Sequence, residues 1–267
     1  QFGCIATDET GRIIDFVEKP AVPPEIPGRP GFSYVSMGNY IFERETLEES
    51  VLSDSERKDS KHDFGRDILP RLFGTHKLMA YDFSTNVLPG DDKPYWKDVG
   101  SIKAYWEAHM DLLRHESPLS LYNPQWPIRT VSYSDPPGFT YPDKDHSCSV
   151  DGCLRAEASR VLGAYVRKSV LSRNCIIHAG SVVEECIIGQ GVEIGEDCRL
   201  RRVIVDAHNK LPAGTSIGFD PVADAERYHV DPASGIVVVG MPQIQLRKEK
   251  NVPGTYDALQ NAEDLGF

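Results

Sequence analysis

Six aliphatic residues recur at a strict interval of six positions in the second half of the chain. They are Val170, Ile176, Val182, Ile188, Ile194 and Leu200. An α-helix repeats every 3.6 residues and a β-strand every two, so neither element accounts for this interval. An interval of six is typical of the hexapeptide coil of a parallel β-helix, in which each of three flat faces takes about six residues. The sequence therefore predicts a solenoid with these side chains buried inside it.

The residues two positions before the aliphatic ones are compact, as expected where the chain turns a corner beside a buried side chain. They are Asn174, Gly180, Cys186, Val192 and Cys198. Gly189 and Gly195 directly follow aliphatic residues, and we interpret them as corner residues that use the backbone freedom of glycine. We expect roughly four coils between residues 149 and 218. The alternative is a β-sandwich of short strands, which would not keep one interval through six matches.

Composition and charge narrow the classes of function. The chain has 267 residues, of which 40% are hydrophobic and 26% charged, which is ordinary for a globular protein with room for two cores. A formal net charge of -11 argues against a general nucleic-acid or membrane-surface binder. No apolar stretch approaches the roughly eighteen residues of a membrane span. We therefore expect a cytoplasmic protein, and a local basic pocket for a small phosphorylated ligand is compatible with this charge.

The six cysteines give no sign of a metal site or a disulfide framework. No two of them form a C-x-x-C pair, and no histidines cluster near them. Cys186 and Cys198 occupy compact positions of the predicted coil, where a thiol acts as a small hydrophobic group. All six are interpreted as reduced thiols.

The first 115 residues alternate between strand and helix patterns. Residues 2–6 and 12–17 form a predicted hairpin around the turn at 8–11, and residues 34–42 a further strand. A helix is expected over 45–52 with Leu47 and Val51 turned inward. Asp63 and Ser101 are predicted N-caps of two more helices. Such alternation indicates part of an α/β sheet.

Three domains follow from this pattern. Residues 1–115 are interpreted as α/β, residues 116–148 as a proline-rich connector, and residues 149–267 as a β-helix with a C-terminal cap and tail. The predicted fold class is therefore α/β plus β.

Several short segments could carry chemistry, although each has a structural explanation when taken alone. Glu18-Lys19-Pro20 is most often a solvated strand end, yet lysine is also a compact charge suited to a phosphate oxygen. Gly38 is explained by a strand bulge, Asp63 by a helix cap, and Trp96 by a packed indole in a turn.

Taken together, these segments resemble the bacterial ADP-glucose pyrophosphorylases (glucose-1-phosphate adenylyltransferases). The segments are FVEKP at 16–20, SMGNYIF at 36–42, HDFGRDILP at 62–70, YWKDVG at 95–100, AYWEA at 104–108 and QWPIRT at 125–130. The resemblance covers nearly the whole chain and implies a partial nucleotidyltransferase sheet followed by a left-handed parallel β-helix. It also implies a reaction, in which ATP and glucose 1-phosphate give ADP-glucose and pyrophosphate on the route to glycogen or starch.

The resemblance assigns roles residue by residue. Lys19 matches the lysine that holds the phosphate of glucose 1-phosphate, and Asp98 matches a carboxylate that binds Mg²⁺. Lys19 and Asp98 are the implied catalytic residues. The positions matched to the glucose 1-phosphate site are Glu18, Lys19, Ser36, Tyr40, Asp63, Phe64 and Trp96. These assignments agree with the chemistry, because attack on the α-phosphorus of ATP needs charge neutralisation and Mg²⁺ uses one or two carboxylates with phosphate oxygens.

The chain departs from the family pattern in two respects. No glycine-rich G-G-x-G-x-R-L segment occurs, so most of the ATP site is absent, and we expect a C-terminal portion that is inactive by itself. Ala207 stands where some members carry an arginine that contacts the activator. The remaining candidates for contacts with sugar-phosphate or nucleotide effectors are Arg199, Arg201, Arg202, Arg247 and Lys248. The resemblance also implies a homotetramer.

Three other functions are weighed. A solenoid acyltransferase would use His178 as a base, but we expect no neighbouring carboxylate to orient this histidine. A pyrophosphorylase for UDP-, dTDP- or GDP-sugars is nearer, and the motifs around Trp96 and Trp126 favour the ADP-glucose enzyme. The missing glycine-rich loop favours the third, a non-catalytic regulatory subunit of the same family.

Overall fold

The computed structural model describes residues 3–18, 20–90, 93–143 and 145–240. The chain forms two compact units. The first comprises Gln1–Leu88 and Asp92–Pro94, and the second comprises Pro89–Asp91 and Tyr95–Phe267. The sequence pattern predicts boundaries at residues 115 and 148 instead. The helix at 102–111 belongs to the second unit because it packs on the solenoid.

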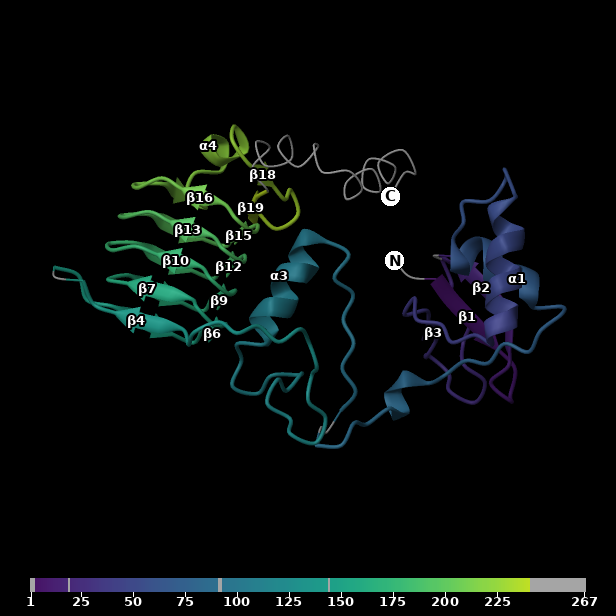
Figure 1. The fold of residues 1–267 in the computed structure, drawn as a ribbon. Helices are drawn as coiled ribbons and strands as arrows, with labels where there is room; N and C mark the ends of the chain where they lie inside the picture. Colours follow the sequence, from purple (N-terminus) through teal and green to yellow (C-terminus); the bar gives the residue numbers. More distant parts are fainter. Residues whose placement is uncertain (1–2, 19, 91–92, 144, 241–267) are drawn as a thin grey trace. The chain divides into compact units, whose positions relative to one another are not determined.

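The first unit is a small sheet beside short helices (Figure 1). Strands β1 (Gly3–Thr7) and β2 (Ile13–Glu18) form the predicted antiparallel hairpin, and β3 (Tyr34–Val35) pairs with the other edge of β1. Helix α1 (Arg44–Ser55) follows, then the π-helical turn η1 (Phe64–Ile68), α2 (Leu69–Leu72) and the 3-10 turn η2 (Phe83–Thr85).

Two expectations about this unit are wrong. The strand predicted over 34–42 ends at Val35, and the chain then bends at Gly38, whose φ is 72°. Leu47 and Val51 of α1 do not point into a core, since they are 36% and 41% exposed. The residue that α1 buries is Asp54. The sequence pattern misses this because a buried carboxylate needs partners from elsewhere in the chain.

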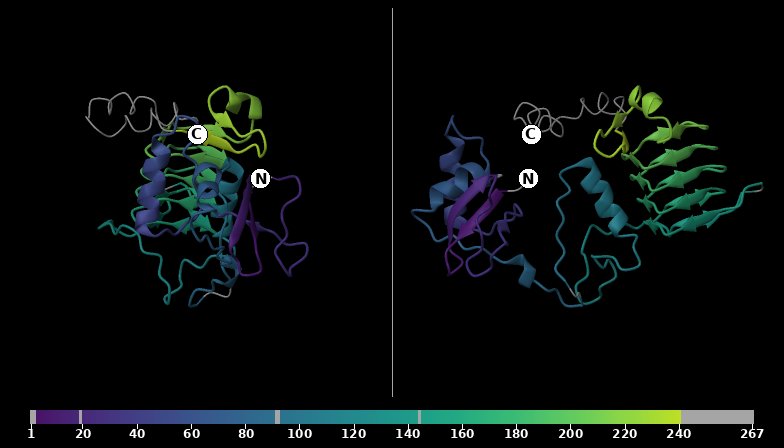
Figure 2. Two further views of the ribbon diagram at one scale, coloured as in Figure 1. Left: turned by 90° about the vertical axis from the view of Figure 1, so that its right-hand side faces the viewer. Right: turned by 180° about the vertical axis from the view of Figure 1, so that it is seen from behind.

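The second unit contains a parallel β-helix, as predicted, with about five turns instead of the expected four. Its strands form three parallel stacks, each hydrogen-bonded from coil to coil (Figures 1 and 2). The first stack contains β4 (Phe139–Tyr141), β7 (Arg160–Leu162), β10 (Ile176–Ile177), β13 (Glu193–Ile194) and β16 (Lys210–Leu211). The second contains β5 (Ser149–Asp151), β8 (Tyr165–Arg167), β11 (Val182–Glu184), β14 (Arg199–Arg201) and β17 (Ser216–Ile217).

The third stack is closed by chain from beyond the regular repeat. It contains β6 (Leu154–Arg155), β9 (Val170–Leu171), β12 (Ile187–Ile188), β15 (Val203–Val205) and β19 (Val237–Val239). Helix α4 (Pro221–Ala225) and β18 (His229–Val230) precede β19, and β18 pairs with it antiparallel. The first coil begins at Phe139, ten residues before the predicted start at 149. Helix α3 (Ile102–Asp111) lies along this third face (Figure 1).

The interval of six predicts the inward residues for half of the solenoid and misses them for the other half. Ile188, Ile194 and Leu200 are fully buried, whereas Val170, Ile176 and Val182 are half-buried. The inward residues there are their successors Leu171, Ile177 and Val183. One face of each coil takes five residues instead of six, as from Val183 to Ile188. A coil is therefore 17 residues long, as the pairing of Ile177 with Ile194 shows.

The corners also differ from the prediction in detail. A residue with positive φ stands three positions before each inward residue, as at Asn174 (58°), Gly180 (72°) and Glu185 (53°). A small buried residue follows each of them, such as Cys175 or Cys186. The compact positions predicted from the sequence therefore contain two kinds of residue. Asn174 and Gly180 have positive φ, whereas Cys186 and Cys198 are the small buried residues that follow such a position.

Gly189 and Gly195 are not corner residues. A Cβ on Gly195 would lie 2.6 Å from the backbone nitrogen of Ala213, and one on Gly189 would lie 2.7 Å from that of Ala207. Both are glycines because the next coil passes too close for a side chain.

Candidate functional site

An aromatic cluster in the first unit brings together residues from two of the quoted segments. The ring centroids of Tyr40 and Phe64 lie 5.8 Å apart, and those of Phe42 and Phe64 lie 5.7 Å apart. The hydroxyls of Ser36 and Tyr40 are 3.0 Å apart, within hydrogen-bonding distance. The Gly38 N–H donates to Ser36 Oγ at 3.2 Å, so the bend at Gly38 folds the 36–40 segment back on itself.

Asp63 and Phe64 are held at the start of η1. Asp63 caps this turn as predicted, its Oδ1 accepting from the backbone N–H of Arg66 at 2.8 Å. Gly65 approaches β2 closely, because a Cβ there would lie 2.8 Å from Phe16 Cζ. Phe16 lies two residues before Glu18, the last residue of β2. Four of the predicted positions, Ser36, Tyr40, Asp63 and Phe64, therefore lie on this cluster or next to it.

The remaining predicted site residues are not part of the cluster. Lys19 lies outside the described residues. Glu18 ends β2, where its backbone pairs with Gly3. Trp96 and Asp98 belong to the second unit. Asp98 is exposed, and its Oδ1 accepts from the Gly100 N–H at 3.0 Å.

The structure contains no preformed metal site built from several side chains within the described residues. Among the described residues, no group of three or more histidine, cysteine or acidic side chains is placed to hold an ion. A single exposed carboxylate such as that of Asp98 is compatible with Mg²⁺, which usually takes its other ligands from phosphate and water.

The candidate regulatory arginines separate into two groups. Arg199 and Arg201 project from β14, and their guanidinium carbons lie 5.0 and 4.9 Å from the ring centroid of Phe219. Arg202 instead lies 5.1 Å from the ring of Trp106 and donates to the backbone oxygen of Ser234. Arg202 is thus used in packing. Arg247 and Lys248 lie outside the described residues.

A buried ionic cluster was not anticipated from the sequence. The Asp54 carboxylate, 3% exposed, accepts from Arg71, from Ser60 Oγ at 2.8 Å and from His62 Nδ1, also at 2.8 Å. Burial raises the pKa of Asp54, but the bonds from His62, Ser60 and Arg71 outweigh it, so the net pKa lies below the usual value. One weak indication is present in the sequence, since His62 begins the segment at 62–70 and Arg71 directly follows it.

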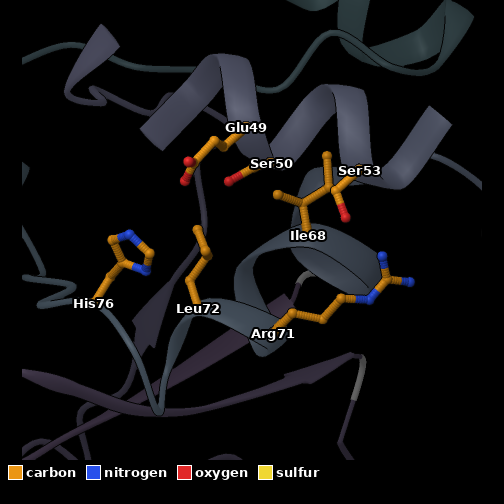
Figure 3. Close-up of a pocket in the computed structure, with 7 residues that line it drawn as sticks. All are labelled: Glu49, Ser50, Ser53, Ile68, Arg71, Leu72 and His76. Carbon is orange, nitrogen blue, oxygen red and sulfur yellow. The ribbon is translucent and has the colours of Figure 1, made fainter. Parts of the chain in front are cut away.

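A shallow pocket of about 350 Å³ adjoins this cluster (Figure 3). Its lining residues are Glu49, Ser50, Ser53, Ile68, Arg71, Leu72 and His76. The side chains of Arg71 and His76 stand at opposite ends of it (Figure 3). None of the predicted site residues lines this pocket.

One further prediction, about His178, is wrong. Its Nε2 lies 3.2 Å from Glu193 Oε1 on the next coil, and Lys210 Nζ lies 3.0 Å from Glu193 Oε2. A carboxylate therefore does accompany this histidine, but it comes from the next coil, 15 positions away in the sequence.

No helix within the described ranges is long and apolar enough to cross a lipid bilayer.

Comparison with known proteins supports both halves of this description. Residues 1–115 match the nucleotidyl transferase family model, and residues 135–239 match the model for the GlmU-like C-terminal hexapeptide. Glucose-1-phosphate adenylyltransferase 1 of Vibrio parahaemolyticus is 45% identical over 241 residues, 90% of this chain and 59% of that protein. The glucose-1-phosphate adenylyltransferase of Deinococcus radiodurans is 40% identical over 243 residues, with the same coverage.

The similarity extends across both compact units. The glucose-1-phosphate adenylyltransferase of Aliivibrio fischeri is 45% identical over 240 residues, which is 89% of this chain. The chain spans about three fifths, 59%, of the length of the relatives that it matches. Over that span it is a homologue of the glucose-1-phosphate adenylyltransferases.

Proposed function

We propose that this chain carries the sugar-phosphate side of an active site that makes ADP-glucose and pyrophosphate from ATP and glucose 1-phosphate. The observation that supports this best is the contact between Ser36, Tyr40 and Phe64. These residues come from segments more than twenty positions apart, and each matches the sugar site of the family. Their contact is what a sugar pocket built from them would require.

The chemistry of the cluster suits a phosphorylated sugar. Aromatic rings offer flat apolar surfaces to the C–H faces of a pyranose ring, while hydroxyls and carboxylates pair with its hydroxyl groups. Tyr40 and Phe64 supply the first kind of surface. Ser36, Asp63 and Glu18 are proposed for the second, and Lys19 for the phosphate.

By resemblance to the family, roles are also proposed for Asp98 and Trp96. Mg²⁺ bound by Asp98 would neutralise charge on the phosphates during the transfer. Trp96 is proposed as a packing residue beside the sugar.

The finer parts of the proposal concern regulation and assembly. Arg199 and Arg201 are proposed contacts for a sugar-phosphate or nucleotide effector, because both residues are exposed on one strand. A homo-oligomer, a tetramer by resemblance to the family, and a cytoplasmic location belong to the same proposal.

Titration calorimetry of the chain with glucose 1-phosphate tests the sugar-phosphate site. Lys19→Gln should weaken binding roughly 30- to 1000-fold, because a charge-assisted bond to a dianion is lost. Tyr40→Phe keeps the ring but loses the hydroxyl beside Ser36, and should weaken binding about two- to tenfold. Tyr81→Phe is the matched control, since Tyr81 Oη also makes one hydrogen bond in the first unit, to Asn86 at 3.3 Å.

Titrations with inorganic phosphate and mannose 1-phosphate distinguish a glucose 1-phosphate site from a general phosphate site and from a site for another sugar phosphate. Weaker binding of both than of glucose 1-phosphate is expected. An unchanged isotherm for Lys19→Gln would contradict the role of this residue, and equal binding of inorganic phosphate would contradict a sugar site.

A further inference from the structure

The 95–100 loop, which carries Asp98, is tied to the far end of the helix that follows it. Lys97 Nζ lies 2.6 Å from Asp111 Oδ2, and the two side chains are 28% and 22% exposed. Asp111 is the last residue of α3, and Arg114 contacts its other oxygen at 3.3 Å. Ser101 caps the near end, accepting from the N–H of Ala104 at 3.2 Å. A helix of ten residues is about 15 Å long. The loop must therefore run back along α3.

The side chain of Trp106 connects helix α3 to the solenoid. Trp106 Nε1 donates to the backbone oxygen of Glu185 at 2.8 Å, and the guanidinium of Arg202 stacks on the indole. Glu185 and Arg202 are corner residues of neighbouring coils, with φ of 53° and 56°. Trp106 thus spans two coils, which restrains both sliding and rolling of the helix.

The burial of the solenoid face under α3 agrees with this arrangement. Ile187 points outward from β12, since its neighbour Ile188 points inward, yet Ile187 is 5% exposed. Ile176, the outward residue of β10 on another face, is only half-buried. The third face of the solenoid is therefore covered at Ile187, two residues after Glu185, which accepts the hydrogen bond from Trp106.

We propose that Lys97, Asp111 and Trp106 are positioning residues that hold Asp98 in place by fastening its loop through α3 to the solenoid. The inference rests on the proposed role of Asp98. A metal ligand must stay within about half an ångström of its working position, which an exposed loop does not provide by itself. The ion pair fixes the loop to the helix, and the indole fixes the helix to two coils. Any change in the solenoid corners at Glu185 and Arg202 then reaches Asp98 through a rigid element.

Hydrogen–deuterium exchange of the full chain tests the two attachments. In Lys97→Met, exchange of the 95–100 loop should accelerate about three- to tenfold, because a partly buried ion pair is lost. Lys97→Arg should restore slow exchange, since the charge and reach are kept. Trp106→Phe retains an aromatic ring without the indole N–H and should accelerate exchange in the loop and in α3 together.

Lys103→Met is the matched control. Lys103 pairs with Glu107 on the same helix at 3.8 Å, but both side chains are about half exposed, at 56% and 43%. This variant should leave loop exchange unchanged. Loop exchange at the wild-type rate in both Lys97→Met and Trp106→Phe would overturn the inference.

Paramagnetic broadening by Mn²⁺, a stand-in for Mg²⁺, adds a readout that packing alone would not change. Broadening of loop resonances should weaken in Lys97→Met and return in Lys97→Arg. Failure of the proposed metal role of Asp98 would give a different result. In that case Asp98→Asn would show the same Mn²⁺ broadening as the wild type, while the 95–100 loop exchanged at the wild-type rate. Faster loop exchange in Lys97→Met without weaker broadening would overturn the positioning role.

Discussion

The two units of this chain bury their apolar side chains to very different extents. In the solenoid, inward residues such as Ile177, Ile188 and Leu200 are fully buried. In the first unit, the buried hydrophobic residues among those described are Cys4, Ile68, Leu69 and Leu72, whereas Ile41 and Leu52 are 103% and 67% exposed. Each coil covers the one before it, so a solenoid builds its core from contacts about one coil apart. A sheet with helices must instead assemble distant segments.

The polar groups buried in the two units differ in the same way. Burial raises the pKa of the Cys186 thiol to about 12 and that of Cys175 to about 11, so both thiols stay neutral within the coil. The first unit buries the charged Asp54, with partners on three sides. A repeating coil can bury a small neutral group at each corner at little cost. A buried charge is stable only where specific side chains pair with it.

The largest expected effect distinguishes two neighbouring isoleucines in the solenoid. Ile177→Ala should lower the free energy of unfolding by about 2–5 kcal/mol, because a fully buried side chain leaves a cavity. Ile176→Ala should cost about 1 kcal/mol, since that side chain points outward from the same strand. Urea unfolding followed by hydrogen exchange of solenoid peptides measures both. A larger loss in Ile176→Ala than in Ile177→Ala would mean that the inward positions follow the interval of six after all.

A smaller effect is expected from the close approach of coils. Gly195→Ala should destabilise the solenoid by about 1–3 kcal/mol, because the new methyl group would meet the backbone of Ala213 and Leu211. Gly74→Ala in the first unit is the control, because nothing lies within 4 Å of its Cβ position. It should cause no loss of stability in the same unfolding experiment. A harmless Gly195→Ala would show that the coils can separate to admit a side chain.

The smallest expected effect is the loss of stability of the first unit at acidic pH. The pKa of Asp54 is lower in the folded chain than its usual 3.8, so its contribution to stability is complete above 3.8 and is lost as the pH falls through the folded value. We expect hydrogen exchange in α1 and α2 to accelerate across that window. Asp54→Asn should remove most of this pH dependence.

Glu193 in the solenoid provides the comparison for this experiment. Bonds from Lys210 and His178 also lower its pKa, but its side chain is 36% exposed and screened by solvent. Glu193→Gln should leave the acid response of the solenoid nearly unchanged. Simultaneous loss of both units in acid, unaffected by Asp54→Asn, would contradict the assignment of acid sensitivity to the first unit.

Features that depend on residues close together in the sequence were predicted, whereas contacts between distant residues were not. The hairpin of β1 and β2 and the caps at Asp63 and Ser101 depend on neighbours within a few positions, and all were predicted. The partners of Asp54 and His178, at separations of up to 17 positions, were not. No local pattern indicates that the indole of Trp106 meets Glu185, 79 positions away.

The sequence by itself determined the solenoid, the α/β character of the first unit and the resemblance to the adenylyltransferases, because repeats and motifs are local patterns of residue type. Only the tertiary structure decided which isoleucine points inward, since a five-residue face shifts the phase of every later coil. It also decided that Ser36, Tyr40 and Phe64 meet, and that Lys97 reaches Asp111. These contacts depend on how the chain bends between the motifs, and the backbone path at Gly38 and along α3 is set by packing and hydrogen bonds that the motifs do not contain.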